Sequence, residues 1–324
     1  TFRKGVMIVC KVTIKDLADY FNWTQIAGDK ESLKRPIHLA DINRPGLELA
    51  GYFEYGQQKR VVVIGNKEIH YITNKMDEIA QRRNFEFITS ESTPGIVITN
   101  GHACPEVLKE IANRKDLAVF STNETTTNTS VRITSYLDEK LAPSIVIHGE
   151  LMRIHGIGVM IVGESGMGKS EIALSLIQKG HQLIADDRID CYKIHNNLIG
   201  RTSRMLEGFM ELRGVGIINV ARMYGVGSYA KECEISLQIE LVPFNDKADY
   251  DRVGIEEKEY VDILGVKILK LQIPISMGRP MATIIETAVF HYMLLRDGKD
   301  AAKEIENLVL QEIEKNEEEE VKSE

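Results

Sequence analysis

A glycine-rich segment at 163–170 has the residue types and the spacing that bind a phosphate chain. Glycines let the backbone curl so that successive N–H groups point at phosphate oxygens, and a following helix adds its own unpaired N–H groups. The Lys169 ammonium can contact the terminal phosphates, and the Ser170 hydroxyl is a ligand for Mg²⁺. The segment therefore predicts a nucleotide or polyphosphate site with Mg²⁺, but not the reaction. It reads Gly163-Glu164-Ser165-Gly166-Met167-Gly168-Lys169-Ser170 and fits G-x-x-x-x-G-K-[ST].

Two acidic residues after the next apolar run supply a candidate base. Asp186 and Asp187 end the run QLIADD. In a parallel sheet, the carboxyl end of this strand lies on the same edge as the phosphate loop. One carboxylate could hold the metal while the other takes the proton of an attacking hydroxyl, and adjacent negative charges raise one pKa. This arrangement favours a kinase, and an Asp pair that only caps a turn is the plainer alternative.

Other charged or glycine-bearing segments could complete such a site. In ELRGVGIINV, Glu211 could complete a Mg²⁺ shell and Arg213 could contact a phosphate. A glycine-bearing loop with an ion pair is the alternative. His148 follows the strand-like run at 144–147, and a lone histidine at a strand end is more often structural or solvated than catalytic.

Two other interpretations of the phosphate loop stay open. Asn74-Lys75-Met76-Asp77 matches the guanine-recognition pattern NKxD, and Asp251-Arg252-Val253-Gly254 matches DxxG, so the chain could be a circularly permuted GTPase. Against this, NKxD precedes the loop, DxxG follows a polar run, and a helix start explains NKMDEIA more simply. The third interpretation is a nucleotide-binding regulatory module without phosphoryl transfer.

The elements expected around these residues form two α/β domains. In the first, 61–64 and 96–99 predict strands, and 75–84 and 105–113 predict helices. The polar segment 121–130 predicts a loop or linker. We place the boundary just after it, which gives a first domain of 1–132.

The second domain, 133–311, begins with a short helix at 135–142 that Pro143 ends. Strand, phosphate loop, helix and strand then follow in order, which suggests a crossover unit with helices on a sheet. The other predicted elements are strands at 144–147, 157–162 and 235–243, and helices at 282–296 and about 300–315. Residues 312–324 form an acidic tail.

Composition narrows the class of protein further. The 324 residues have a net charge of −8, and the tail alone holds seven Glu and two Lys, so no basic surface for nucleic acid is indicated. No apolar run reaches the ~18 residues of a membrane helix, and no signal peptide is evident. The four cysteines lie far apart, which favours the reducing cytoplasm over a disulfide framework.

Taken in order, these segments resemble the HPr kinase/phosphorylase family of bacterial enzymes, which modify a serine of the phosphocarrier protein HPr. The resemblance covers most of the chain. It is carried in the second domain by LAPSIVIHGEL, GVMIVGESGMGKSE, GHQLIADD, ELRGVGIINV and YDRVG. In the first domain it is carried by RPGLELAGYF and PGIVITNG. The segment ELRGVGIINV is close to the family's own signature.

The resemblance implies an N-terminal mixed α/β domain with an accessory or regulatory role, and a C-terminal P-loop-containing kinase domain. It implies that 163–170 binds the ATP phosphates, and that Ser170 and Glu211 bind Mg²⁺. Asp187 would accept the proton in phosphorylation and donate it in the reverse reaction. The other matches are the active-site positions His148, Lys169 and Arg252 and the signature or phosphate-region positions Arg213, Gly214, Gly216, Asn219, Gly278 and Arg279.

Family members phosphorylate HPr with ATP or pyrophosphate, remove the phosphate by phosphorolysis with inorganic phosphate, and are typically cytoplasmic homohexamers. This implies a regulator of carbon catabolite repression and sugar uptake. One segment departs from the family: a stretch that usually reads P-V-R-P-G-R-N is here Pro274 to Pro280, PISMGRP. Gly278 and Arg279 match, whereas Ser276 replaces an arginine and Pro280 an asparagine. The stretch matters for dephosphorylation, so the balance of the two activities is open.

Overall fold

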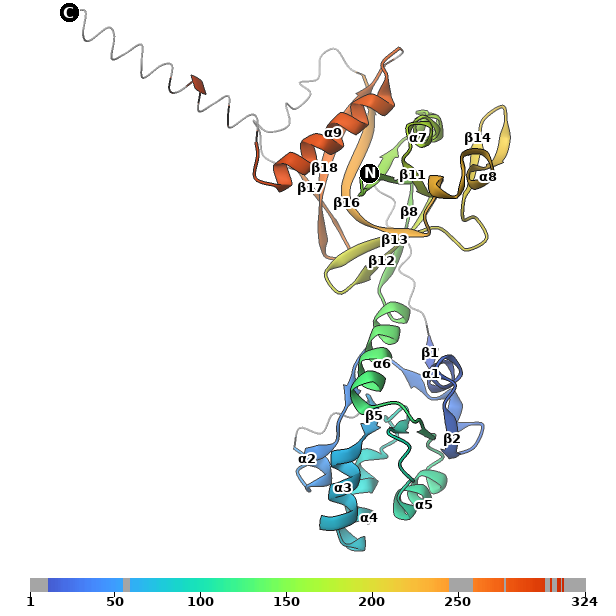
Figure 1. Cartoon of the computed structure of the whole chain (residues 1–324), viewed down its shortest axis with the longest axis vertical. Helices are drawn as coiled ribbons and strands as arrows, with labels where there is room; N and C mark the ends of the chain where they lie inside the picture. The colour runs from blue at the N-terminus through green and yellow to red at the C-terminus, as the bar shows by residue number, and fades with distance from the viewer. Residues whose placement is uncertain are drawn as a thin grey trace, which may run out of the picture. The chain divides into compact units, whose positions relative to one another are not determined.

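The computed structural model describes residues 11–54, 59–244, 259–276 and 278–300, together with 304, 308, 309 and 311. The described chain divides into two compact units, and the division falls between Ala142 and Pro143 (Figure 1). Each unit has its own sheet and its own buried apolar residues. Among the described residues, no helix combines the length and the apolar character needed to cross a bilayer.

The first unit is built on a five-stranded sheet with the order β2-β7-β6-β5-β4. Neighbouring strands from β4 to β7 run parallel, and β2 pairs antiparallel with β7. β1 and β3 form a separate antiparallel pair. The strands are β1 (Val12–Thr13), β2 (Thr24–Ala27), β3 (Pro36–Ile37), β4 (Ile42–Asn43), β5 (Val61–Ile64), β6 (Ile96–Ile98) and β7 (Val119–Ser121).

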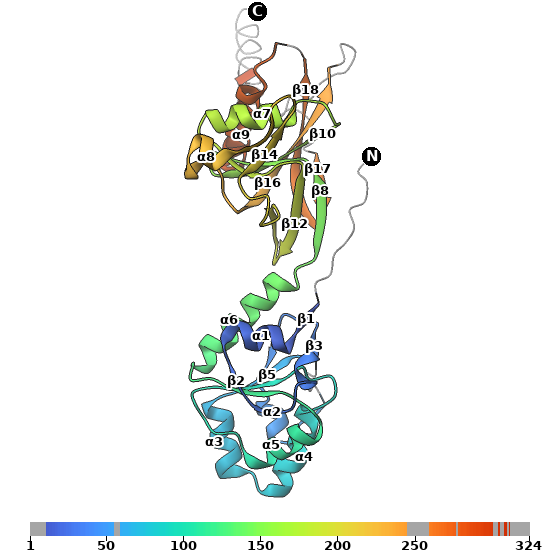
Figure 2. The same cartoon turned by 90° about the vertical axis from the view of Figure 1, so that its right-hand side faces the viewer.

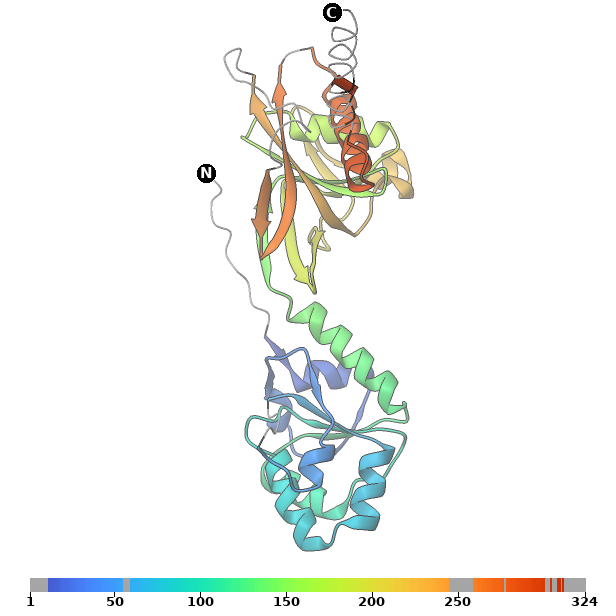
Figure 3. The same ribbon diagram turned by 90° about the vertical axis from the view of Figure 1, so that its left-hand side faces the viewer.

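Helices cover both faces of this sheet, with α3, α4 and α5 on one side and α1 and α6 on the other (Figure 2, Figure 3). Side chains of β5 alternate between the two faces, as the period of a strand requires: Val62 packs with the first group and Val63 with the second. The helices are α1 (Ile14–Phe21), α2 (Gly46–Leu49), α3 (Asn66–Lys75), α4 (Glu78–Ile88), α5 (Glu106–Arg114) and α6 (Thr126–Lys140), with the 3-10 turn η1 (Ser32–Lys34).

The segment 121–130 is not the predicted linker, because α6 begins within it. The Thr125 side chain accepts a hydrogen bond from the Asn128 N–H and caps the helix, while Ile133 and Leu137 are fully buried against the sheet. The hydroxyl-bearing residues of this segment therefore cap and begin a helix rather than form a loop. The unit boundary lies at 142/143, ten residues beyond the predicted 132/133.

The NKxD pattern has a local structural explanation. Lys75 ends α3, and the Asp77 carboxylate accepts a hydrogen bond from the Ala80 N–H at 2.8 Å as the N-cap of α4. A helix therefore starts within this segment as predicted, but the predicted helix at 75–84 is wrong at its first residues, because α3 ends at Lys75 and α4 runs from Glu78 to Ile88. The DxxG pattern at 251–254 lies outside the described residues.

The second unit contains a nine-stranded sheet with the path β11-β9-β10-β16-β13-β12-β8, to which β18 and β17 add beside β16. β9 pairs antiparallel with both β10 and β11, so β10 and β11 run in the same direction with β9 between them. β14 and β15 form a separate hairpin. The strands are β8 (Ser144–His148), β9 (Glu150–Ile154), β10 (Ile157–Gly163), β11 (Gln182–Ala185), β12 (Arg188–Ile194), β13 (Asn197–Arg201), β14 (Phe209–Leu212), β15 (Gly216–Asn219), β16 (Glu232–Pro243), β17 (Tyr260–Ile263) and β18 (Val266–Ile275).

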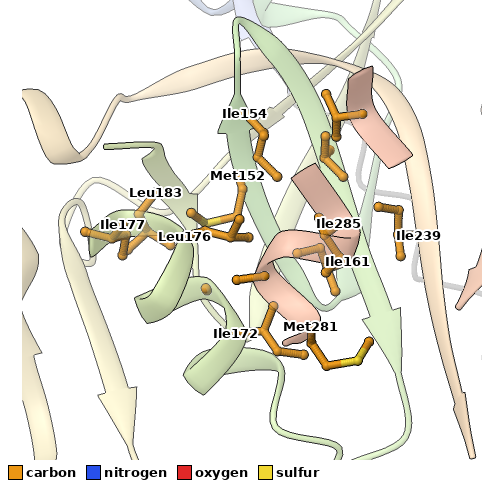
Figure 4. Packing of buried hydrophobic residues seen from close by; sticks show 14 of the residues in the cluster. Met152, Ile154, Ile161, Ile172, Leu176, Ile177, Leu183, Ile239, Met281 and Ile285 are labelled. Carbon is orange, nitrogen blue, oxygen red and sulfur yellow. The ribbon is translucent and has the colours of Figure 1, made fainter. Parts of the chain in front are cut away.

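Two helices, α7 and α9, cover one face of this sheet. Ile172 and Leu176 of α7 and Ile285 of α9 pack with Met152 and Ile161 of the strands (Figure 4). A second cluster, which includes Cys191 and Cys233, fills the other side. The helices are α7 (Lys169–Gln178), α8 (Val220–Tyr224) and α9 (Met281–Arg296), with the 3-10 turn η2 (Val226–Ser228). The predicted helix at about 300–315 and the tail 312–324 lie mostly or wholly outside the described residues.

Candidate active site

The glycine-rich segment connects the end of β10 directly to the start of α7. Gly166 and Gly168 adopt φ values of +89° and +75°, in the left-handed region that favours glycine. Gly168 is the N-cap residue of α7, and Lys169 is its first helical residue. The segment therefore has the strand–loop–helix context that phosphate binding requires, with helix N–H groups at its end.

Lys169 folds back over this loop. Its side-chain ammonium donates hydrogen bonds to the carbonyl oxygens of Gly163 at 3.3 Å and Glu164 at 3.2 Å. The residue is only 7% exposed. The charge is therefore held inside the curl of the loop, where a phosphate chain would lie.

Acidic side chains surround the Ser170 hydroxyl. The hydroxyl donates to Glu150 Oε1 and Asp186 Oδ1, each at 3.3 Å. The other oxygen of Asp186 accepts a hydrogen bond from the Glu211 N–H at 2.8 Å. Hydroxyl and carboxylate oxygens are the ligands that Mg²⁺ prefers. The Glu211 carboxylate belongs to a residue that lines the same cavity.

Glu150 is a site residue that the sequence reasoning missed. Burial, aided by the hydrogen bond and the negative charge of Asp186, raises its pKa to about 9, although the Asp187 N–H and the Lys169 charge oppose the shift. Glu150 is the first residue of β9, the strand between β10 and β11. A glutamate ahead of the apolar residues Leu151 and Met152 was the available signal, but only the strand pairing places it beside Ser170.

The Asp187 carboxylate contacts His148. Its Oδ1 lies 3.0 Å from His148 Nδ1, and both side chains are solvent-exposed. Asp187 has a φ of +63°, a conformation that aspartate tolerates better than most residues, and its carbonyl accepts from the Gly149 N–H at 3.1 Å. The two adjacent carboxylates therefore have different surroundings.

A single cavity of about 210 Å³ joins these groups. The Arg213 guanidinium reaches across it to donate to Ser165 Oγ at 3.4 Å. The cavity brings together most of the predicted catalytic, metal and phosphate-binding side chains and is strongly polar. It is lined by His148, Glu150, Ser165, Gly166, Gly168, Lys169, Ser170, Glu171, Asp186, Asp187, Glu211 and Arg213.

Other predicted site residues do not line the cavity. Gly214 lies in the turn of the β14–β15 hairpin and Gly216 begins β15, both with positive φ, and the Asn219 side chain caps α8 by accepting from the Arg222 N–H. Arg279 donates to the Pro274 carbonyl at 3.2 Å and lines a separate groove between β18 and α9. Arg252 lies outside the described residues.

Comparison with known proteins identifies the class to which this arrangement belongs. The family model HPr Serine kinase N terminus matches residues 12–137, and HPr Serine kinase C-terminal domain matches residues 139–309. The two matches meet inside α6, close to the unit boundary.

The chain belongs to the HPr kinase/phosphorylase family. It is 39% identical over 312 residues to HPr kinase/phosphorylase 1 of Oceanobacillus iheyensis, covering 96% of this chain and 99% of that protein. It is 36% identical over 313 residues to HPr kinase/phosphorylase of Bacillus subtilis, covering 96% and 100%. The solved Hpr(Ser) kinase/phosphatase of Coxiella burnetii is 34% identical and covers 49% of this chain and 97% of that one, with a TM-score of 0.45. The resemblance noted from the motifs is therefore confirmed, and the protein is an enzyme of the kinase/phosphorylase class.

Proposed function

We propose that this chain is a bifunctional enzyme that phosphorylates a serine of the phosphocarrier protein HPr and removes that phosphate by phosphorolysis. ATP or pyrophosphate is the donor, inorganic phosphate is the acceptor in reverse, and Mg²⁺ is the metal. The observation that carries the proposal is the cavity that Lys169, Ser170 and Asp187 line together. We place the enzyme in the cytoplasm, as a regulator of carbon catabolite repression and sugar uptake.

The chain's own groups bind and orient the donor. The loop N–H groups and the Lys169 ammonium hold the phosphate oxygens, and Arg213 adds positive charge at the mouth of the loop. Ser170 and Glu211 would hold Mg²⁺, with Asp186 and Glu150 beside them. When bound, this ion neutralises charge on the phosphates. Most of the rate enhancement then comes from positioning and charge.

In the forward direction, the serine Oγ of HPr attacks the terminal phosphorus and the bond to the ADP or phosphate leaving group breaks. Asp187 takes the serine proton, and His148 holds its carboxylate in place. In reverse, an oxygen of inorganic phosphate attacks the phosphoserine phosphorus. The serine oxygen leaves with the proton from Asp187, and pyrophosphate forms.

We also propose the wider organisation of the enzyme. The first unit has an accessory or regulatory role, the second unit up to residue 311 is a P-loop catalytic domain, and 312–324 is an acidic tail. The working form is a homohexamer. The replacements at Ser276 and Pro280 act on the dephosphorylation side, because the corresponding family stretch matters there.

The test is incubation with HPr and Mg²⁺ plus ATP, or plus pyrophosphate, with serine phosphorylation measured by mass. Phosphorylated HPr is then incubated with inorganic phosphate, and pyrophosphate release is measured. Transfer to serine in the first assay supports the proposal. Hydrolysis of GTP without HPr would instead support a GTPase, and tight nucleotide retention without any turnover would support a binding module.

A further inference from the structure

Three metal-ligating side chains meet at the edge of the second unit opposite to the phosphate loop. His155 lies in the turn before β10 and His181 just before β11, whereas the loop and Asp186 follow the ends of the same two strands. The seven residues of β10 separate the two edges by roughly 20 Å. The third side chain, Glu286, comes from α9.

The ligand atoms of these residues already lie close together. His181 Nε2 is 2.8 Å and His155 Nε2 is 3.5 Å from the same oxygen, Glu286 Oε1. One ligand atom from each residue lies within 4.8 Å of those of the other two. Ligand atoms about 2.0–2.2 Å from a tetrahedral zinc ion are roughly 3.3–3.5 Å apart, so only small side-chain movements would admit the ion.

Neighbouring groups hold these side chains in place. The His155 ring packs on Phe290 with ring centroids 4.3 Å apart, and against the His181 ring at 4.6 Å. Lys179 pairs with the other Glu286 oxygen, Oε2, at 2.5 Å and leaves Oε1 to the histidines. This ion pair fixes the orientation of the Glu286 carboxylate.

Burial differs across the cluster and leaves one open side. The His181 side chain is 6% exposed and Glu286 16%, whereas His155 is 33% exposed. A pair of imidazoles and one carboxylate is a donor set that suits zinc, and the exposed side has room for water as the fourth ligand.

We propose that His155, His181 and Glu286 form a second metal site, which binds Zn²⁺ and fastens α9 to the starts of β10 and β11. The ion would join three segments that are distant in sequence. Because it binds the folded state, it raises the melting temperature of this unit by an amount that grows with the logarithm of the ratio of free Zn²⁺ to the dissociation constant. The site stands on its own geometry and does not depend on the proposed phosphoryl transfer.

The test is a Zn²⁺ titration of the full chain without a histidine tag, in saturating Mg²⁺ so that the oxygen ligands beside Ser170 are occupied. Affinity is measured by competition with a chromophoric chelator, and the melting temperature is recorded with and without Zn²⁺. Co²⁺ gives a second readout, because its visible absorption is strong only in tetrahedral surroundings.

We expect one Zn²⁺ per chain, a higher melting temperature, and at least about a tenfold loss of affinity in His155→Asn and Glu286→Gln. His155→Asn is the key variant, because the exposed position leaves the fold intact. His148→Ala, which removes a histidine from the other cavity, is the matched control and keeps the affinity. Absence of stoichiometric Zn²⁺ binding, or binding lost in His148→Ala but kept in His155→Asn, would overturn the proposal.

Discussion

His148 Nδ1 and Asp187 Oδ1 lie 3.0 Å apart, although one side chain ends β8 and the other precedes β12. The pairing of β8 with β12 creates this contact, because Arg188 is the register partner of His148. An imidazole at this distance holds the carboxylate in one orientation and separates it from the neighbouring Asp186. The two acids of the pair therefore have different partners: Asp186 accepts from Ser170, and Asp187 contacts His148.

Replacing Asp187 by asparagine should remove proton transfer but keep the shape of the site. We expect serine phosphorylation of HPr to fall about 10²–10⁴-fold, while ATP affinity changes little. Rates from mass measurements and affinities from equilibrium titration of the same sample check this. The phosphorylation rate should fall less in His148→Ala, because His148 acts only through Asp187. An equal loss of rate and ATP affinity in Asp187→Asn would point to a structural or metal-binding role instead.

Replacing Lys169 by alanine should abolish both directions, because both use the same phosphate loop. The expected loss is at least about 100-fold in each assay, as for a positioned donor to a reacting group. Lys193→Ala, on β12 and outside the residues that line the cavity, serves as the control and keeps both activities. Full activity of Lys169→Ala in either direction would disprove a shared site.

Restoring arginine at Ser276 should increase phosphorolysis. A charge-assisted hydrogen bond to phosphate contributes roughly 1.5–3 kcal/mol, so we expect about a tenfold gain or more in phosphate-dependent release from phosphorylated HPr. Ser276→Gln provides a control of similar polarity without the charge. The idea that Ser276 limits this reaction fails if the arginine variant is no faster than the wild type.

Gly158 is a position where packing admits no side chain. A Cβ atom there would lie 1.9 Å from the Glu234 carbonyl oxygen, in the paired strands β10 and β16. Gly158→Ala should lower the free energy of unfolding by about 1–3 kcal/mol or more. Gly227→Ala is the matched control, since a Cβ there meets no atom within 4 Å. Urea unfolding of the two variants side by side tests this, and equal midpoints would contradict it.

Burial raises the pKa of the Cys191 and Cys233 thiols to about 12. Both thiols should resist alkylating and disulfide reagents at pH 8 until the second unit unfolds. The measurement is the rate of thiol labelling in a Cys10→Ser, Cys104→Ser background, in which Cys191 and Cys233 are the only cysteines of the sequence. Labelling faster than unfolding would contradict the prediction.

The same shift has a consequence for stability. Unfolded thiols ionise near pH 9, whereas the folded ones stay protonated to about pH 12. The contribution of the two protonated thiols to the free energy of unfolding is therefore fully present below pH 9 and declines as the pH rises toward 12. Replacing both residues by alanine should flatten this alkaline decline in urea midpoints, relative to the background variant.

Local sequence patterns predicted those helices and strands whose formation depends on a few neighbouring residues. The strand at 61–64 matches β5 at both ends, and the helix predicted from residue 75 starts three residues later, at Glu78, because a β-branched run and a capping side chain act over a few residues. The glycine loop between a strand and a helix was likewise evident from spacing alone.

Features set by distant pairing were not predictable in this way. Glu150 reaches Ser170 because β9 lies between β10 and β11, a placement that no local pattern encodes. The start of α6 was missed because its polar residues are typical of loops, and only burial of Ile133 and Leu137 on the sheet outweighs that tendency.

The Lys169 ammonium donates hydrogen bonds to two carbonyl oxygens of its own loop. An incoming anion has to displace these internal partners before it gains the lysine. If the loop binds a phosphate chain as proposed, sulfate would replace only these partners, whereas a longer polyanion could extend from the lysine to the helix N-terminus at Ser170. We therefore expect longer polyanions to compete better for the loop than simple salts.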